Sequence, residues 1–246
     1  MKIILSPAKK MKTDLETLEP LALPVFLEQT EELLHWLREK SYEELKILWN
    51  CNEKIAKLNQ ERLAAMDLRN QLTPAILSYE GIAYQYMAPA VFEREQLSYV
   101  QEHLRILSAF YGVLKPMDGV TPYRLEMQAK ASVGDSRDLY GFWQDRIYQE
   151  IVEEDRVIVN LASKEYSKCV ERYLSENDRM IGCVFGELIQ GKVVQKGTYA
   201  KMARGEMVRF MAKRQIGRPE EIKEFDRLGY GFCEELSSEK EYVFLK

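Results

Sequence analysis

The sequence predicts a single compact α/β domain, with a mixed β-sheet whose parallel core strands are flanked by helices and with an N-terminal helical segment. Three short aliphatic runs, at Lys2–Leu5, Ile106–Phe110 and Val157–Leu161, each give way to a polar turn. An aliphatic run bounded by turn signals is typical of a strand covered on both faces, as in a parallel sheet. No linker or low-complexity stretch interrupts the chain, so residues 1–246 are expected to form one domain.

The segment between the first two strands is predicted to be mainly helical. Val25–Lys40 carries apolar residues at helical spacing. A capping box at Ser41–Glu44 opens a helix that runs toward Asn50, and another helix runs to about Met66. The last two form either a helix-hairpin-helix phosphate binder or an ordinary packed pair, and the absence of glycine from their turn favours the packed pair. We expect three further elements before the central strand. They are a helix that starts at Thr73-Pro74 with Thr73 as its cap, an aromatic loop at Tyr79–Pro89, and a helix at Phe92–His103.

The C-terminal half is predicted to alternate helices and strands around the third aliphatic run. The expected elements are helices at Asp138–Val152 and Lys164–Leu174, a hairpin of Met180–Ile189 with Lys192–Val194, a long helix capped by Thr198 and ending near Gln215, and a closing hairpin of Phe225–Cys233 with Tyr242–Leu245. The long helix is basic, which separates it from the rest of the chain.

Charge is distributed unevenly along the sequence. The net charge is −4, yet residues 191–218 carry eight lysines and arginines against the single acid Glu206, a local charge of +7. Segregation of this kind indicates a polyanionic partner more strongly than the overall charge does.

The cysteine and histidine content argues against a metal centre. Four cysteines lie far apart with no CxxC pair, and only two histidines are present. This pattern argues against a zinc knuckle or a disulfide framework and suits a reducing compartment. The first apolar run is too short for a signal peptide and nothing resembles a membrane span. The chain is therefore expected to be cytoplasmic, with no membrane partner, no metal and no cofactor.

The polar residues that follow the strands are candidate site residues, because the carboxyl ends of parallel strands meet at one edge of a sheet. Ser6 and Lys9 form a nucleophile with its base, a turn that binds phosphate or carboxylate, or a purely structural turn. Ser163, Lys164 and Glu165 lie at a strand-to-helix junction, where helix-end amides favour anions. No P-loop, nucleophile elbow, dinucleotide fingerprint or metal motif is present.

The loop after the central strand carries an aromatic residue, a guanidinium and a carboxylate. Tyr111 and Tyr123 are expected to line the cleft at the strand ends. If residues 123–126 are extended, Arg124 and Glu126 share one face. They form either a structural ion pair or a site in which Arg124 binds an anion and Glu126 is a general acid or base.

The basic helix has two distinct faces at about 100° per residue. Lys201, Arg209 and Lys213 lie on one side, and the apolar residues on the other. Arg204 falls on the apolar stripe, where a guanidinium either reaches the edge of the stripe or meets a specific anion or carboxylate. Gly205 beside it costs a helix about 1 kcal/mol relative to alanine. That cost is tolerable where something must approach the backbone closely.

Five segments together resemble the signature motifs of the bacterial peroxide-stress protein YaaA family (DUF328, UPF0246). They are Ser6–Lys9 (SPAK), Leu107–Pro116 (with YGVLKP), Pro122–Met127 (PYRLEM), Asn160–Tyr166 (NLASKEY) and Ala200–Gly205 (AKMARG). The segments occur in the family's order, and the match extends over essentially the whole chain. The resemblance implies a cytoplasmic protein that limits intracellular free iron during peroxide stress. It also implies a compact α/β fold with a positively charged cleft and double-stranded DNA binding through a helix-hairpin-helix-like element.

Two hypotheses use the same cleft. In the first, double-stranded DNA binds without sequence preference, the cleft floor is organised by Arg124 and Glu126, and phosphates are contacted by Lys9, Lys201, Arg204, Arg209 and Lys213. In the second, the chain is an enzyme acting on a nucleobase or small nucleotide-like ligand. Its acid or base is then Glu126 or Glu165, Ser6 or Ser163 contacts the substrate, and its phosphate is held by Arg124 or Arg204. An iron-binding buffer is disfavoured because no ligand set is present. Whether the chain is an enzyme, and its oligomeric state, are left open.

Overall fold

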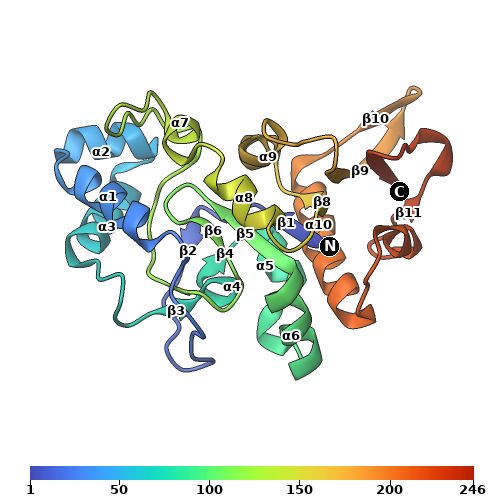
Figure 1. Ribbon diagram of the computed structural model, residues 1–246, viewed down its shortest axis with the longest axis horizontal. Coiled ribbons are helices and arrows are strands. Elements are labelled where there is room, and N and C mark those ends of the chain that lie inside the picture. The colour runs from blue at the N-terminus through green and yellow to red at the C-terminus, as the bar shows by residue number, and fades with distance from the viewer.

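A mixed sheet of eight strands forms the centre of the protein, and its core strands are parallel, as predicted (Figure 1). The computed structural model describes residues 1–246. The strands of this sheet are β1 (Lys2–Leu5), β5 (Leu104–Ser108), β6 (Gly112–Leu114), β8 (Val157–Leu161), β9 (Arg179–Ile189), β10 (Lys192–Val194), β11 (Gly231–Phe232) and β12 (Glu241–Leu245). Their order is β11-β12-β9-β8-β1-β5-β6, with β10 paired to β9.

The three aliphatic runs are neighbours in this sheet. β1 lies between β8 and β5 and is parallel to both, with Leu5 opposite Leu161 on one side and Ile106 on the other. β8 is also parallel to β9, and β9 is parallel to β12. Three strands pair antiparallel: β6 with β5, β11 with β12, and β10 with β9. Ile3, Ile4 and Leu5 are almost completely buried, as expected for a strand covered on both faces.

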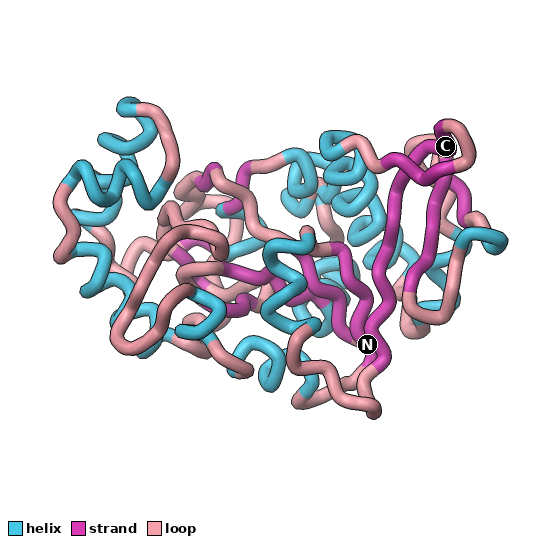
Figure 2. Tube along the Cα trace, turned by 90° about the horizontal axis from the view of Figure 1, so that it is seen from above, coloured by secondary structure: helices cyan, strands magenta, loops and turns pink.

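Helices lie on both sides of the sheet, as the view from above shows (Figure 2). They are α1 (Leu27–Arg38), α2 (Tyr42–Trp49), α3 (Glu53–Ala65), α4 (Ala75–Ser78), α5 (Ile82–Met87), α6 (Arg94–His103), α7 (Leu139–Trp143), α8 (Arg146–Val152), α9 (Lys164–Glu171) and α10 (Gly197–Arg214), with 3₁₀ turns η1 (Pro89–Val91), η2 (Pro219–Glu224) and η3 (Glu234–Leu236). The predicted capping box of α2 is present: the Glu44 N–H donates to Ser41 Oγ and the Ser41 N–H donates to Glu44 Oε2.

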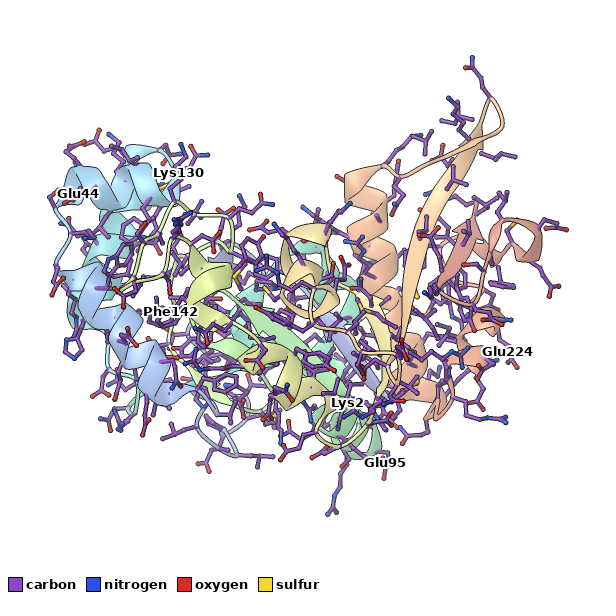
Figure 3. All side chains as sticks on the ribbon, turned by 45° about the horizontal axis from the view of Figure 1, so that its top comes forward. Lys2, Glu44, Glu95, Lys130, Phe142 and Glu224 are labelled. Atoms are coloured by element: carbon purple, nitrogen blue, oxygen red, sulfur yellow. The ribbon has the colours of Figure 1, made fainter.

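The first three helices form one end of the molecule and the β9–β10 hairpin the other. Figure 3 shows Glu44 of α2 and Glu224 of η2 near these opposite ends, with the hairpin extending beyond the body of the protein. None of the helices combines the length and apolar character needed to cross a membrane.

Two predictions for residues 73–89 are wrong. Thr73 does not cap a helix: it lies in β3 (Thr73–Pro74), which pairs with β7 (Gly119–Val120), and its Oγ1 accepts the Asp14 N–H at 2.8 Å. The predicted loop at Tyr79–Pro89 instead contains β4 (Tyr79–Glu80), paired with β2 (Lys10–Met11), followed by α5. In both cases the strand forms by pairing with a segment that is distant in the sequence. Local sequence patterns contain no information about such pairing.

Two predicted helices differ in their limits. Asp138–Val152 is broken into α7 and α8 at Gln144, whose φ is 49°. Trp143, just before the break, is fully buried and donates from Nε1 to the Ala109 carbonyl at 2.9 Å, so core packing fixes the bend. Thr198 is inside α10 and does not cap it, because Lys196 occupies the N-cap position.

Candidate functional site

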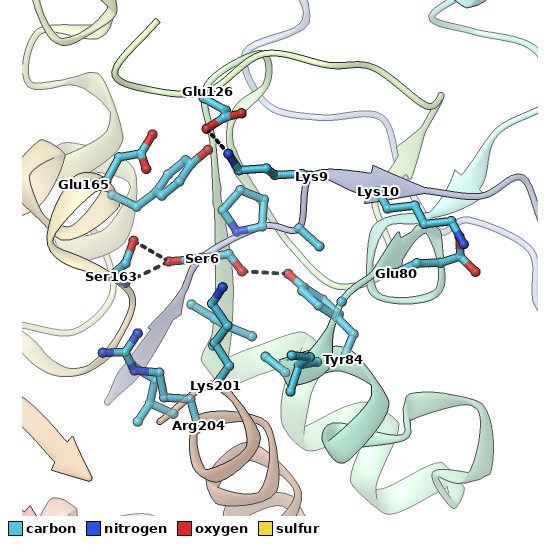
Figure 4. Close-up of a pocket in the computed structure, with 18 of the residues that line it drawn as sticks. Ser6, Lys9, Lys10, Glu80, Tyr84, Glu126, Ser163, Glu165, Lys201 and Arg204 are labelled. Carbon is cyan, nitrogen blue, oxygen red and sulfur yellow. Dashed lines mark hydrogen bonds and ion pairs between the residues drawn. The ribbon is translucent and has the colours of Figure 1, made fainter. Parts of the chain in front are cut away.

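The ends of β1 and β8 bring two serines into contact. Ser6 and Ser163 lie just beyond the last pair of these parallel strands. Ser6 Oγ accepts the Ser163 N–H at 2.8 Å and lies 3.2 Å from Ser163 Oγ, and the Tyr84 hydroxyl donates to the Ser6 carbonyl at 3.0 Å (Figure 4). The predicted convergence of polar strand ends is therefore confirmed.

The end of β5 contributes to the same edge through a buried hydroxyl network. Tyr123 lines the site, and its hydroxyl lies 2.7 Å from Ser108 Oγ and 2.9 Å from the Tyr79 hydroxyl. Burial raises the pKa of Tyr123 to about 12, so its hydroxyl stays protonated at neutral pH. Tyr123 therefore contributes a neutral side chain with a hydrogen-bonded hydroxyl to the wall of the site.

A pocket of about 410 Å³ opens at this edge. Its walls come from the turn after β1, from β4 and α5, from residues 123–126, from the first turn of α9 and from the first half of α10. The charged residues that line it are Lys9, Lys10, Arg124, Lys201 and Arg204 together with Glu80, Glu126 and Glu165. Five cations against three carboxylates make the pocket positive by two charges.

Glu126 is held by two cations. Lys9 Nζ lies 2.6 Å from Glu126 Oε2, and Arg124 Nη2 lies 3.6 Å from Glu126 Oε1. Arg124 also donates through Nε and Nη2 to the Trp49 carbonyl, each at 3.4 Å, and its side chain is only 10% exposed. The prediction that Arg124 and Glu126 share a face is confirmed, and Arg124 is bound to the scaffold.

The same contacts argue against Ser6 and Lys9 as a nucleophile and its base. The Lys9 side chain extends to Glu126, away from Ser6, while Ser6 Oγ is hydrogen-bonded to Ser163 (Figure 4). A base must lie within hydrogen-bond reach of the hydroxyl that it deprotonates. The geometry instead makes Ser6 a link between the ends of β1 and β8.

Arg204 has no partner in the chain. It makes no hydrogen bond or ion pair, and its Nε is buried without a hydrogen-bond partner although the residue lines the pocket. Burial lowers the pKa of the guanidinium below its ordinary value, because a low-dielectric environment disfavours the charged form. Lys201, one turn earlier on α10, is exposed at the pocket and is also unpaired.

Gly205 explains how Arg204 reaches the pocket. A Cβ at this position would lie 1.9 Å from the Ala83 carbonyl oxygen of α5. The expected close approach of a backbone is thus confirmed: α10 packs directly against α5, and only glycine permits the contact. This packing places the first half of α10 beside the strand ends.

Glu165 differs from the other two carboxylates in the pocket. Its Oε1 accepts the Gln128 N–H at 3.2 Å, and no cation pairs with it. Ser163, at the N-cap position of α9, makes no capping hydrogen bond to that helix because its groups are directed to Ser6. Glu165 therefore retains free acceptor capacity in the pocket.

Four predicted site residues lie outside the pocket. Tyr111 is 1% exposed, belongs to the core and accepts the Thr121 N–H at its hydroxyl oxygen, so it does not line the cleft. Lys164 is exposed beyond the pocket wall, and Arg209 and Lys213 lie further along α10. The tight packing of Tyr111 against Phe110 and Tyr123 explains its burial.

The sequence analysis did not assign to the site three polar residues that line the pocket: Lys10, Glu80 and Tyr84. Tyr166, which also lines it, belongs to the segment Asn160–Tyr166 that the sequence analysis singled out. Glu80 and Tyr84 belong to the segment interpreted as a loop, and Lys10 pairs with Glu80 at 3.0 Å across β2 and β4. For Glu80 and Tyr84 the only signal was the density of tyrosines between residues 79 and 86, which is also typical of a core.

Part of the positive charge of residues 191–218 is neutralised in space. Lys196 pairs with Glu187 at 2.8 Å, Arg214 pairs with Glu224, and Arg218 Nη2 lies 3.9 Å from Glu221. The acids come from outside the segment. The cations left without an acidic partner are Lys192, Lys201, Arg204, Arg209 and Lys213.

Two of the four free cysteines, Cys169 and Cys183, are buried. Burial raises the pKa of the Cys169 and Cys183 thiols to about 12, so both are protonated at neutral pH and poor nucleophiles. No group of three or more histidine, cysteine, aspartate or glutamate side chains is placed to hold a metal ion.

Comparison with known proteins gives matches along nearly the whole chain. The family model described as peroxide stress protein YaaA matches residues 1–236. A UPF0246 protein of Agathobacter rectalis is 63% identical over 244 residues, which cover 99% of this chain and 98% of the relative. UPF0246 proteins of Lachnoclostridium phytofermentans and Pediococcus pentosaceus are 58% and 53% identical over 246 residues, covering 96% and 98% of those proteins. With the SPAK turn, the PYRLEM segment and Arg204-Gly205 meeting at one pocket, this chain belongs to the peroxide stress protein YaaA (UPF0246) family.

Proposed function

We propose that this protein protects the cytoplasm during peroxide stress by binding double-stranded DNA and by limiting intracellular free iron. Membership of the peroxide stress protein family supports a role in peroxide stress. The DNA part is supported by the unpaired cations of α10: Lys201 and Lys213 are exposed, Arg209 is partly exposed, and none has an acidic partner. Lys9 also lines the pocket and its side chain is 67% exposed, but its ammonium is paired with Glu126 at 2.6 Å.

These cations suit contact with phosphates and not with bases. At about 100° per residue, Lys201, Arg209 and Lys213 span about one third of the circumference of α10. Cations that neutralise phosphates release condensed counterions, and this release makes affinity fall with salt without discriminating sequence. The expected binding is therefore independent of sequence and strongly dependent on salt.

Helices α2 and α3 are the proposed helix-hairpin-helix-like contribution. They are connected through residues 50–52, and Asn50 adopts a left-handed conformation with φ of 42°. Asparagine is one of the few residues that adopt this conformation readily, so the tight connection between α2 and α3 forms without the glycines whose absence favours an ordinary packed pair. Substitution of the partly exposed Lys46 and the exposed Lys54 by alanine should then weaken duplex binding.

The DNA function is tested by fluorescence anisotropy of a labelled duplex across a salt series. Lys201→Ala and Arg209→Ala should each reduce the slope of log affinity against log salt by about one. Lys196→Ala is the matched control, because its ammonium is already paired with Glu187, and it should change the slope less. Salt-independent binding, or full affinity when Lys201 and Arg209 are both replaced, would contradict this function.

The pocket itself supports a second candidate, an enzyme that acts on a nucleobase or nucleotide. A volume of about 410 Å³ is in the range of small-molecule sites, and a double helix is far wider. Glu165 is the available acid or base, because Glu126 is engaged by Lys9 and Arg124. Loss of substrate or appearance of product on incubation with nucleotides, abolished by Glu165→Gln, would establish turnover; unchanged substrates would remove this candidate.

A further inference from the structure

Most charges in the pocket are matched within the chain, and the exceptions indicate what is to be bound. Lys10 pairs with Glu80, and both Lys9 and Arg124 pair with Glu126. The unmatched groups are Lys201, Arg204 and Glu165. A ligand complementary to them carries an anionic group and, separately, a hydrogen-bond donor.

Arg204 is the strongest of these indications. A guanidinium with a buried Nε and no partner is costly, because its desolvation is not repaid by an ion pair or hydrogen bond. Core helices accommodate methionine or leucine at such a position without this cost. The arrangement is favourable when an anion enters, since charge-assisted hydrogen bonds from arginine to phosphate are strong and can be bidentate.

The unmatched groups lie at two sides of the pocket. Figure 4 shows Lys201 and Arg204 on the side formed by α10, Glu165 on the opposite side, and the linked Ser6 and Ser163 between them. Tyr84, Tyr123 and Tyr166 contribute to the walls. Aromatic side chains in the walls of a pocket that also holds unmatched cations and a carboxylate suit a flat polar ring attached to a phosphate.

We propose that the pocket binds a small phosphomonoester of nucleotide size, with its phosphate at Arg204 and Lys201 and a donor group of its base at Glu165. This site rests on the second candidate function above and specifies its ligand. It also assigns Arg204 to the pocket, because the residue lines the pocket and its Nε is buried without a hydrogen-bond partner. Lys201, which is exposed, serves both ligands.

Isothermal titration of the full chain with nucleoside 5′-monophosphates, the corresponding nucleosides and inorganic phosphate tests the site. At least one monophosphate should bind, and its nucleoside should bind about tenfold or more weakly. Arg204→Gln should weaken monophosphate binding by about 10- to 100-fold, and Lys201→Gln, at an exposed position, by less. Glu165→Gln should weaken the binding of the monophosphate and leave the affinity for inorganic phosphate unchanged.

Arg214→Gln is the matched control on the same helix, because Arg214 is paired with Glu224 outside the pocket, and its affinity for monophosphates should be unchanged. Arg204→Gln removes an unpaired charge, so its thermal midpoint should be equal or higher, and its salt slope for duplex should remain close to that of the parent. Binding without turnover would remove the enzyme and keep this site. Turnover that survives Arg204→Gln and Lys201→Gln, or no binding of any monophosphate at millimolar concentration, would overturn it.

Discussion

At the residue scale, the site depends on side chains whose hydrogen bonds are fixed by residues distant in the sequence. Ser6 is bonded to Ser163, and Tyr123 to both Tyr79 and Ser108. Each hydroxyl joins two elements, so its removal affects the pocket wall and the packing together. Buried polar groups of this kind contribute most when every member has a partner.

Tyr123→Phe should lower the free energy of unfolding by about 1–3 kcal/mol, because it leaves the Tyr79 and Ser108 hydroxyls with one partner fewer in a buried site. Urea denaturation followed by circular dichroism measures the loss. Tyr86→Phe is the control: Tyr86 is half-buried on α5 and makes no side-chain hydrogen bond, so its effect should stay within about 0.5 kcal/mol. Equal effects of the two substitutions would exclude a structural role for the hydroxyl network.

At the element scale, the packing of α10 against α5 positions the pocket. α10 carries Lys201 and Arg204, and α5 carries Tyr84, whose hydroxyl bonds to the turn after β1. The close contact at Gly205 and Ala83 fixes the distance between these helices. The small size of Gly205 therefore allows the spacing that brings residues of α10, α5 and the turn after β1 to the same pocket.

Gly205→Ala should destabilise the protein by about 2 kcal/mol or more, although alanine is the better helix former by about 1 kcal/mol. The added Cβ meets backbone and not a flexible side chain, so one helix has to move. Gly197→Ala, in the first turn of the same helix with nothing within 4 Å of its Cβ, should be neutral or slightly stabilising. Urea unfolding of both variants measures the difference, and a stabilised Gly205→Ala protein would show that the helices do not touch there.

At the scale of the whole molecule, charges that are separated in the sequence compensate one another in space. Glu187, Glu221 and Glu224 neutralise three cations of residues 191–218. Of the five cations that remain, Lys192 lies on β10 and the other four lie on α10, with Lys201 and Arg204 at the pocket. A buried titratable group outside the pocket, the carboxyl of Asp118, also affects the stability of the whole fold.

Asp118 should make the protein less stable as pH rises from about 5 to 7. Burial raises its pKa to about 7, against the attraction of Lys115 and Arg105 and with repulsion from Glu150. The folded state therefore retains a proton that the unfolded state releases, and the stability gained at low pH is lost as pH rises to the folded pKa, by up to about 1.4 kcal/mol per pH unit. Asp118→Asn keeps an acceptor for the Lys115 N–H and should remove this slope. Urea unfolding at several pH values measures both curves, and parallel curves would contradict the assignment.

The sequence by itself determined the parallel core strands, most of the helices and the presence of Ser6, Arg124, Glu126, Ser163 and Glu165 at one edge of the sheet. These follow from local periodicity and from the rule that parallel strands end together. It also singled out Arg204 and Gly205, because a charge and a glycine in an apolar helical stripe break a local rule.

Only the tertiary structure decided which charges are matched. Lys9 and Glu126, Lys10 and Glu80, and Arg214 and Glu224 come from different elements, and ion pairing depends on distance in space, which a linear pattern does not contain. The same reason explains the burial of Tyr111 and the helix α5 in place of a loop, since packing against distant segments outweighs local propensity. The unpaired state of Arg204, from which the phosphate site is inferred, is likewise a property of the folded chain alone.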